Sequence, residues 1–178
     1  MMPLHSKRSP SSVAAYIAAM TALAAVVGYL EQLIPVSFFG IPGVKLGLAN
    51  IVSLIALYLF GKVHAFIIMT ARVILVGLMF GNMYAIAFSL AGGVLSLIIM
   101  ILLKKTGLFS ITGVSAAGGA GHNAGQLITA ILTLDSINLV YYIPVLMISG
   151  TVCGTVTGIL AGVILNRTGM SLMTKERG

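Results

Sequence analysis

Long apolar stretches, separated by short runs of polar, glycine and proline residues, make up most of this chain. A helix that crosses a bilayer needs about 20 mostly apolar residues, with a range of roughly 17–25. The pattern predicts six such helices, at Val13–Ile34, Lys45–Phe60, Ala65–Phe80, Met83–Leu103, Gly113–Leu134 and Leu139–Leu165. We therefore expect an all-α integral membrane fold: one six-helix bundle in a single domain over residues 1–178, with tails at 1–12 and 166–178.

The composition agrees with a membrane protein and excludes an ordinary soluble domain. Hydrophobic residues are 59% of the 178 and charged residues only 7%, against roughly 25% charged in soluble domains. Cys153 is the single cysteine, so no internal disulfide can form. The first apolar stretch continues past the small residues "TALA" to Ile34, and we expect it to remain as a span rather than to be cleaved as a signal peptide.

The basic residues predict the orientation, because cytoplasmic connections are enriched in Lys and Arg. With the N-terminus inside, the outer connections receive only Lys45, and Arg72 falls inside the third span. The remaining basic side chains then lie inside: Lys7, Arg8, Lys62, Lys104, Lys105, Arg167, Lys175 and Arg177. We expect both termini in the cytoplasm of a bacterial-type cell with the protein in its plasma membrane. The net charge of +7 is then explained without a nucleic-acid partner.

The fifth segment, "GVSAAGGAGHNAGQL", is unusually polar for a span. At about 100° per residue, one stripe collects Ser115, Gly118, Gly119, His122, Gln126, Thr129 and Thr133, with Asn123 beside it. We expect Leu127, Ile128, Ile131 and Leu132 to face away. The stripe is either a helix-packing surface or a ligand-binding wall that contains His122, Asn123 and Gln126. Asp135 and Ser136, which follow the segment, are expected to cap the last helix.

Arg72 lies near the middle of the third predicted span. A charge at that depth costs at least about 2.5–3.5 kcal/mol and needs a partner. One partner is Glu31, the only acidic residue inside a predicted span. The alternative is an anionic group of a ligand, which the planar guanidinium suits by donating two parallel hydrogen bonds.

Two further polar residues lie at the start of the second predicted helix. Lys45 follows "GIPG", where the free N–H groups of a helix N-terminus also attract anions. Lys45 therefore either helps to form an anion site or extends its amine to the membrane surface. Asn50 lies deeper, and either extends such a site or hydrogen-bonds to a neighbouring helix.

Small residues recur every four positions on two of the predicted helices. Ala14, Ala18 and Ala22 form such a row on the first helix, which allows another helix to approach closely. That helix is either part of the bundle or belongs to a partner protein. The last helix carries a similar row, which we expect to pack internally: Gly150, Gly154, Gly158 and Gly162.

Four segments together resemble the family of Gx transporters, which is also labelled heptaprenyl diphosphate synthase component I. They are "IPGVKLGLANIVSLIALYLFG", an Arg in the next span, "FSLAGGVLSLIIM" and "GVSAAGGAGHNAGQL". The family is grouped with the substrate-binding S-components of energy-coupling factor (ECF) vitamin transporters. The resemblance implies a ligand site reached from outside, a first loop over it at residues 35–44, and docking through Ala14, Ala18 and Ala22. The implied partners are a coupling membrane subunit and two ATPases.

The enzyme label is not supported by the acidic residues. Prenyl diphosphate synthases of the usual kind bind magnesium through clustered aspartates, and hard cations prefer oxygen ligands. This chain has three acidic residues, Glu31, Asp135 and Glu176, which are far apart in the sequence. We therefore expect no catalytic residues, no metal site and no cofactor. ATP hydrolysis, if it is used, must come from a partner.

These observations predict an S-component-like subunit that binds a small, anionic molecule, such as a vitamin, a flavin or an isoprenoid-related compound. The expected binding residues are Glu31, Lys45, Asn50, Arg72, His122, Asn123 and Gln126. Two alternatives stay open: a non-catalytic membrane component of heptaprenyl diphosphate synthase, and a structural membrane subunit of a larger complex.

Overall fold

The protein is helical over the residues that its computed structural model describes, 10–33 and 48–167. In chain order the elements are α1 (Pro10–Leu33), α2 (Asn50–Leu59), α3 (Lys62–Phe80), α4 (Met83–Thr106), α5 (Ile111–Leu134), the 3₁₀ helix η2 (Ile137–Tyr142) and α6 (Ile143–Arg167). The predicted all-α architecture is confirmed. Within these two ranges, four helical segments are long and apolar enough to cross a membrane: Ser11–Glu31, Lys62–Phe80, Met83–Thr106 and Ile137–Arg167. The count of six spans and the cytoplasmic termini stay predictions.

Local capping residues explain where several helices begin and end. The Asn82 side chain accepts a hydrogen bond from the Ala85 N–H (2.8 Å) at the start of α4. The Ser110 hydroxyl does the same for the Gly113 N–H (3.2 Å) at the start of α5. Gly107 ends α4 with a φ of 67°, a backbone angle that glycine adopts without steric cost. These residues satisfy backbone groups that a helix leaves unpaired at its ends.

The predicted caps of the last helix are corrected by the structure. Asp135 instead ends α5, in a left-handed conformation with a φ of 46°, which short polar residues tolerate better than most. Ser136 precedes η2 but makes no side-chain capping hydrogen bond. The chain enters α6 through this 3₁₀ turn, so α6 begins at Ile143 rather than at Leu139.

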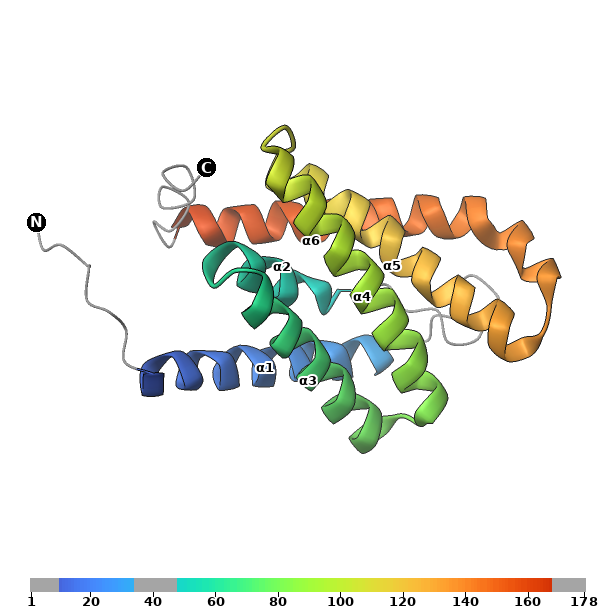
Figure 1. Ribbon diagram of the computed structural model, residues 1–178, viewed down its shortest axis with the longest axis horizontal. Coiled ribbons are helices and arrows are strands. Elements are labelled where there is room, and N and C mark those ends of the chain that lie inside the picture. The colour runs from blue at the N-terminus through green and yellow to red at the C-terminus, as the bar shows by residue number, and fades with distance from the viewer. Residues whose placement is uncertain (1–9, 34–47, 168–178) are drawn as a thin grey trace, which may run out of the picture.

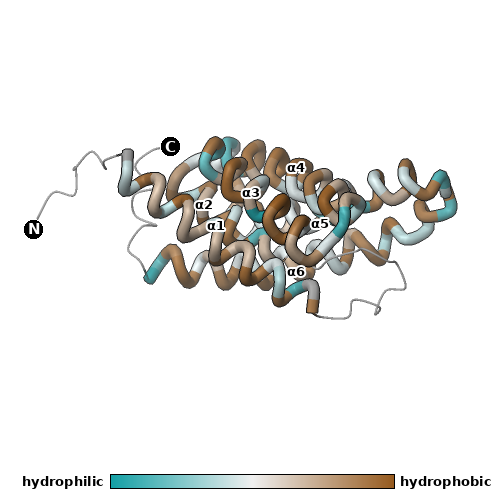
Figure 2. The backbone as a smooth tube through the Cα atoms, turned by 90° about the horizontal axis from the view of Figure 1, so that it is seen from below, coloured by the Kyte–Doolittle hydropathy of each residue, from teal (hydrophilic) through white to brown (hydrophobic). Residues whose placement is uncertain are grey.

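The helices form a bundle in which α5 packs between α4 and α6 (Figure 1). On the other side of α4, α3 packs against α4 and α1. In the view of Figure 1, α1 begins and α6 ends toward the left, while the turn between α5 and α6 lies at the far right. Figure 2 shows that the helices are mostly hydrophobic along their length, with hydrophilic positions at helix ends and at a few places inside the bundle.

The second helix is shorter and more buried than predicted. It begins at Asn50 rather than at Lys45, which lies outside the described residues, and its 10 residues span about 15 Å. Six consecutive residues, from Val52 to Leu57, are buried. A helix that is buried on all sides belongs to the interior of a bundle, so α2 is covered by its neighbours, including α1, α3 and α6.

Charged side chains from two other helices meet the two ends of α2. At its N-terminus, the Ala49 N–H donates to Glu31 Oε2 of α1 (3.3 Å). Near its C-terminus, Lys104 Nζ of α4 donates to the Leu57 carbonyl (2.8 Å) and lies 4.4 Å from the centre of the Tyr58 ring. A carboxylate at the N-terminus and an ammonium at the C-terminus both match the helix dipole. The two contacts therefore fix α2 between α1 and α4.

We predict that Lys104→Met destabilises the protein by about 1 kcal/mol, because it removes a charged hydrogen bond to Leu57 and a contact with Tyr58. The neighbouring substitution Lys105→Met is the matched control, since Lys105 is exposed, and it should change stability by less than about 0.5 kcal/mol. Thermal unfolding of both variants in the same detergent measures the difference. Equal melting temperatures for the two variants would contradict the stabilising role of Lys104.

Glycines bring α5 and α6 into backbone contact. A Cβ atom on Gly150 would lie 2.9 Å from the carbonyl carbon of Gly119. One on Gly158 would lie 2.8 Å from the Cα of Thr112. Close by, the Ser115 and Thr157 hydroxyls share a hydrogen bond of 3.1 Å. Three glycines of the predicted row, Gly150, Gly154 and Gly158, therefore pack internally, whereas a Cβ on Gly162 would have no neighbour within 4 Å.

Candidate functional site

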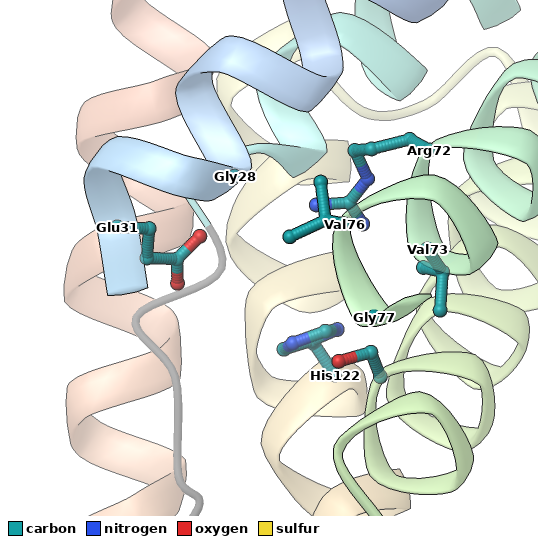
Figure 3. Close-up of a pocket in the computed structure, with 8 residues that line it drawn as sticks. Gly28, Glu31, Arg72, Val73, Val76, Gly77 and His122 are labelled. Atoms are coloured by element: carbon teal, nitrogen blue, oxygen red, sulfur yellow. The ribbon is translucent and has the colours of Figure 1, made fainter. Parts of the chain in front are cut away.

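A small cavity lies inside the bundle where polar side chains from four helices meet (Figure 3). Glu31 comes from α1, Arg72 from α3, Ser89 from α4 and His122 from α5. The rest of the lining is apolar or lacks a side chain: Gly28, Val73, Val76 and Gly77. In Figure 3 the side chains of Glu31, Arg72 and His122 extend toward the same space. Residues far apart in the sequence thus form one polar site in an apolar bundle.

The two charged groups of this cavity are almost fully buried. The exposed fraction is 3% for Glu31 and 7% for Arg72. Glu31 is near enough to interact electrostatically with the Arg72 guanidinium, and its Oε2 also accepts the hydrogen bond from the Ala49 N–H. The Arg72 Nε atom has no hydrogen-bond partner among the described residues. Since a buried donor without a partner is costly, Arg72 retains capacity to bind an acceptor.

The cavity is small, and Gly28 forms part of its wall. Its volume of about 20 Å³ holds roughly one water molecule, so a larger ligand requires the surrounding helices to move apart. A Cβ on Gly28 would lie 3.7 Å from Arg72 Nη1 and 3.5 Å from Val76 Cγ2. Alanine would therefore fit at position 28, but a longer side chain would reach into the polar site.

A second glycine fixes the position of His122. A Cβ on Gly92 of α4 would lie 2.8 Å from both Nδ1 and the backbone oxygen of His122. A Cβ on Gly125, one turn further along α5, would lie 2.6 Å from the Ala91 carbonyl oxygen. Glycines on both helices thus allow α4 and α5 to cross closely. The His122 ring consequently packs against the bare Cα of Gly92 at the edge of the cavity.

The structure separates the predicted binding residues into two groups. Glu31, Arg72 and His122 line the cavity. Asn50, Asn123 and Gln126 are not among the residues that line the cavity. The fourth, Lys45, lies outside the described residues. Binding roles for all seven residues stay predictions.

Asn123 has a structural contact with α6. Its Nδ2 atom donates to the Leu146 carbonyl (2.8 Å) and to the Ser149 hydroxyl (3.1 Å). These bonds are of the kind that hold helices together in membranes. Gln126 is also buried, with 1% of its surface exposed, whereas Asn50 is only partly buried at the first turn of α2. The polar residues of α5 therefore serve both the cavity and the α5–α6 contact.

The predicted polar stripe of α5 is buried along most of its length, but the prediction for the opposite face was partly wrong. Ser115, His122 and Gln126 are buried, while Thr133 is exposed. Ile128 and Leu132 face outward as predicted, with 53% and 78% exposed. Leu127, in contrast, is buried against Leu146, and Ile131 is partly buried beside it. The buried surface is wider than one stripe because α5 contacts both α4 and α6.

Sequence reasoning did not identify Ser89 and Gly28 as cavity residues. Gly28 precedes Glu31 by three positions, a spacing that places both on one helix face. Ser89 lies beside "LAGG" in α4, a segment noted only for its resemblance. Both patterns are visible in the sequence. They indicate cavity residues only when the positions of α1 and α4 around Arg72 are known.

Outside the cavity, the predicted row of alanines on α1 can be located. Ala14, Ala18 and Ala22 are exposed on α1. No group of three His, Cys, Asp or Glu residues that could hold a metal ion occurs within residues 10–33 and 48–167. Glu31 and Asp135 lie in different parts of the bundle, and Glu176 is outside these ranges.

Comparison with known proteins identifies one family. Residues 20–164 match the family described as heptaprenyl diphosphate synthase component I. Neither the comparison with curated proteins nor that with solved structures gives a match. The match covers most of the chain, from within α1 to the last turn of α6. The protein is therefore a member of the heptaprenyl diphosphate synthase component I family.

Proposed function

We propose that this membrane protein is the substrate-binding subunit of an uptake transporter of the energy-coupling factor type. It binds a small molecule with an anionic group, of the vitamin, flavin or isoprenoid-related classes, and has no catalytic activity of its own. The observation that carries the proposal is the buried site formed by Arg72, Glu31 and His122. Ionisable residues inside a membrane bundle are costly and are typical of substrate pathways.

In this proposal each polar residue has a separate role. Arg72 binds the anionic group, because its Nε has no partner among the described residues and a guanidinium suits a carboxylate or phosphate. Glu31 balances the charge of Arg72 while the site is empty. His122, held against Gly92, orients the ligand by hydrogen bonding. Lys45 and the N-terminal part of α2 supply additional positive potential on the outer side.

The partners in this proposal are a coupling membrane subunit and two ATPases. Support comes from α1, whose exposed alanines Ala14, Ala18 and Ala22 lie in a row with a spacing of four. Such a row lets a second helix approach closely. In addition, only 17% of the most apolar stretch of α1 is buried within the bundle. Much of this helix is therefore available to a partner.

We expect wild-type protein purified in detergent to release a small anionic compound when it is denatured, and Arg72→Ala to release about tenfold less. A tenfold loss corresponds to about 1.4 kcal/mol, a modest value for a charged hydrogen bond. Mass spectrometry of the released compounds measures this difference. Lys105→Met is the control and should release as much compound as the wild type.

Two results would contradict the proposal. One is equal release from wild type and from an Arg72→Ala protein that still elutes as a single folded species in size-exclusion chromatography. The other is a wild-type protein that releases no compound at all. Co-purification with two ATPases would support the transport role, and their absence from a complex captured in mild detergent would oppose it.

A second candidate function follows from the family description. A component of heptaprenyl diphosphate synthase would bind a soluble, aspartate-rich subunit and contribute no metal site of its own. The same buried arginine would then bind a diphosphate group. Capture of a prenyl synthase subunit instead of ATPases, with synthase activity that requires both proteins, would favour this function over transport.

A further inference from the structure

The turn between α5 and α6 exposes several apolar and aromatic side chains. No residue of η2 is buried. Ile137 is 72% exposed and Tyr141 84% exposed, and Leu134, just before the turn, is 62% exposed. Only Leu139 packs inward, against the small cluster of Leu127 and Leu146. Neighbouring apolar side chains that are exposed together are costly in water and indicate a surface that binds a membrane or another molecule.

Helix length places this turn relative to the bilayer. The 25 residues of α6 span about 37 Å, which exceeds the hydrocarbon core of about 30 Å. With Arg167 at one boundary of the core, the start of α6 lies about 5 Å beyond the opposite boundary, even with an ordinary tilt of about 20°. Since each headgroup layer is about 5–8 Å thick, η2 falls inside that layer rather than in free water.

The residues of the turn suit this environment. Tyr141 and Tyr142 carry a polar hydroxyl on an apolar ring, and such rings are enriched at the membrane–water interface. Asp135 and Asn138 supply polar groups beside them. The exposed face of the turn continues into the outward-facing residues Leu132 and Ile148 of the adjoining helices, which are 78% and 66% exposed. Exposed apolar residues therefore occur both on the adjoining helices and in the turn.

We propose that η2 and its flanking residues Leu134 and Ile143 form an interfacial anchor that binds the headgroup layer of the bilayer. Tyr141 and Ile137 enter the boundary between headgroups and acyl chains, and Asp135 stays hydrated. The anchor holds the α5–α6 pair at a fixed depth. Figure 1 shows this turn as the most distant part of the described bundle from the start of α1, so the anchor acts at one end of the molecule.

The absence of tryptophan from the chain permits a direct test. Tyr141→Trp introduces a single indole into the turn as a fluorescent reporter. Val156→Trp is the matched control, because Val156 is 48% exposed on α6 and lies about 16 Å from Arg167, near the middle of the core. Each variant is reconstituted in phosphatidylcholine–phosphatidylglycerol vesicles that contain lipids spin-labelled either at the headgroup or deep in the acyl chain.

We expect the headgroup label to quench the indole of the Tyr141→Trp variant about threefold more than the deep label, and the reverse for the Val156→Trp variant. Quenching of the turn reporter by aqueous iodide, but by neither lipid label, would show that the turn is in water. A turn reporter that neither iodide nor any lipid label quenches would show that protein covers it. Either result overturns the proposal. Ile137→Trp provides a second reporter with the same expected pattern if Tyr141→Trp does not fold.

Discussion

Arg72→Met is expected to lower the free energy of unfolding by about 1–3 kcal/mol, because it removes a buried positive charge that interacts electrostatically with the Glu31 carboxylate. Glu31 is only 3% exposed and lies near the guanidinium in the same cavity. Methionine replaces the aliphatic part of arginine without its charge, so the effect reports the electrostatic loss rather than a cavity. Unfolding in a graded series of SDS–detergent mixtures measures the change.

The double variant Arg72→Met with Glu31→Gln separates this electrostatic effect from a general loss of packing. Removing both charges should recover a large part of the lost stability, since two interacting buried charges that are replaced together often cost little. Glutamine also keeps an oxygen that can accept the hydrogen bond from the Ala49 N–H. A double variant as unstable as the sum of the two single variants would contradict coupling between Glu31 and Arg72.

Gly154→Ala is expected to destabilise the protein by about 1–3 kcal/mol, although it adds only a methyl group. A Cβ at position 154 would run into the Ser115 carbonyl oxygen and lie 2.9 Å from the Cα of Ala116. Both neighbours are backbone atoms of α5 and cannot rotate away, so α5 and α6 must separate. Thermal unfolding in detergent measures the loss.

Gly162→Ala is the control for this substitution, because a Cβ at position 162 would meet no atom within 4 Å. Both glycines lie in α6, and alanine has the higher helix propensity. Gly162→Ala should therefore be neutral or slightly stabilising. Equal destabilisation by the two substitutions would indicate that helix flexibility, rather than the close α5–α6 approach, explains the glycine row.

The sequence allowed the bundle to be predicted because hydropathy and short capping signals are local. The end of α3 at Phe80 and the start of α4 at Met83 agree with the prediction, since Gly81 and Asn82 mark the turn within the chain itself. The second helix was placed too early, at Lys45, because apolar residues alone do not distinguish a span from a short buried helix. Its start at Asn50 coincides with a contact to Glu31, which the local sequence does not contain.

The residues that line the cavity were predicted in part, for a similar reason, while their binding roles stay predictions. Arg72 and His122 are polar residues in apolar segments, and that cost alone singles them out. Whether such residues meet one another depends on how the helices cross. Asn123 lies one position from His122, yet its amide donates to Leu146 and Ser149 of α6. Because successive residues of a helix are rotated by about 100°, neighbours such as His122 and Asn123 lie on different faces of α5. Sequence spacing does not reveal which neighbouring helix each face contacts.

The contact between Glu31 and the start of α2 has a consequence for biosynthesis. Glu31 lies near the end of α1 and is synthesised before either Ala49 or Arg72, the groups it meets in the folded protein. Until those segments emerge, its carboxylate has no place inside a bilayer, where an isolated charge is costly. We therefore expect the C-terminal part of α1 to settle into the membrane only together with α2 and α3. These three helices would then enter as one cooperative unit during insertion.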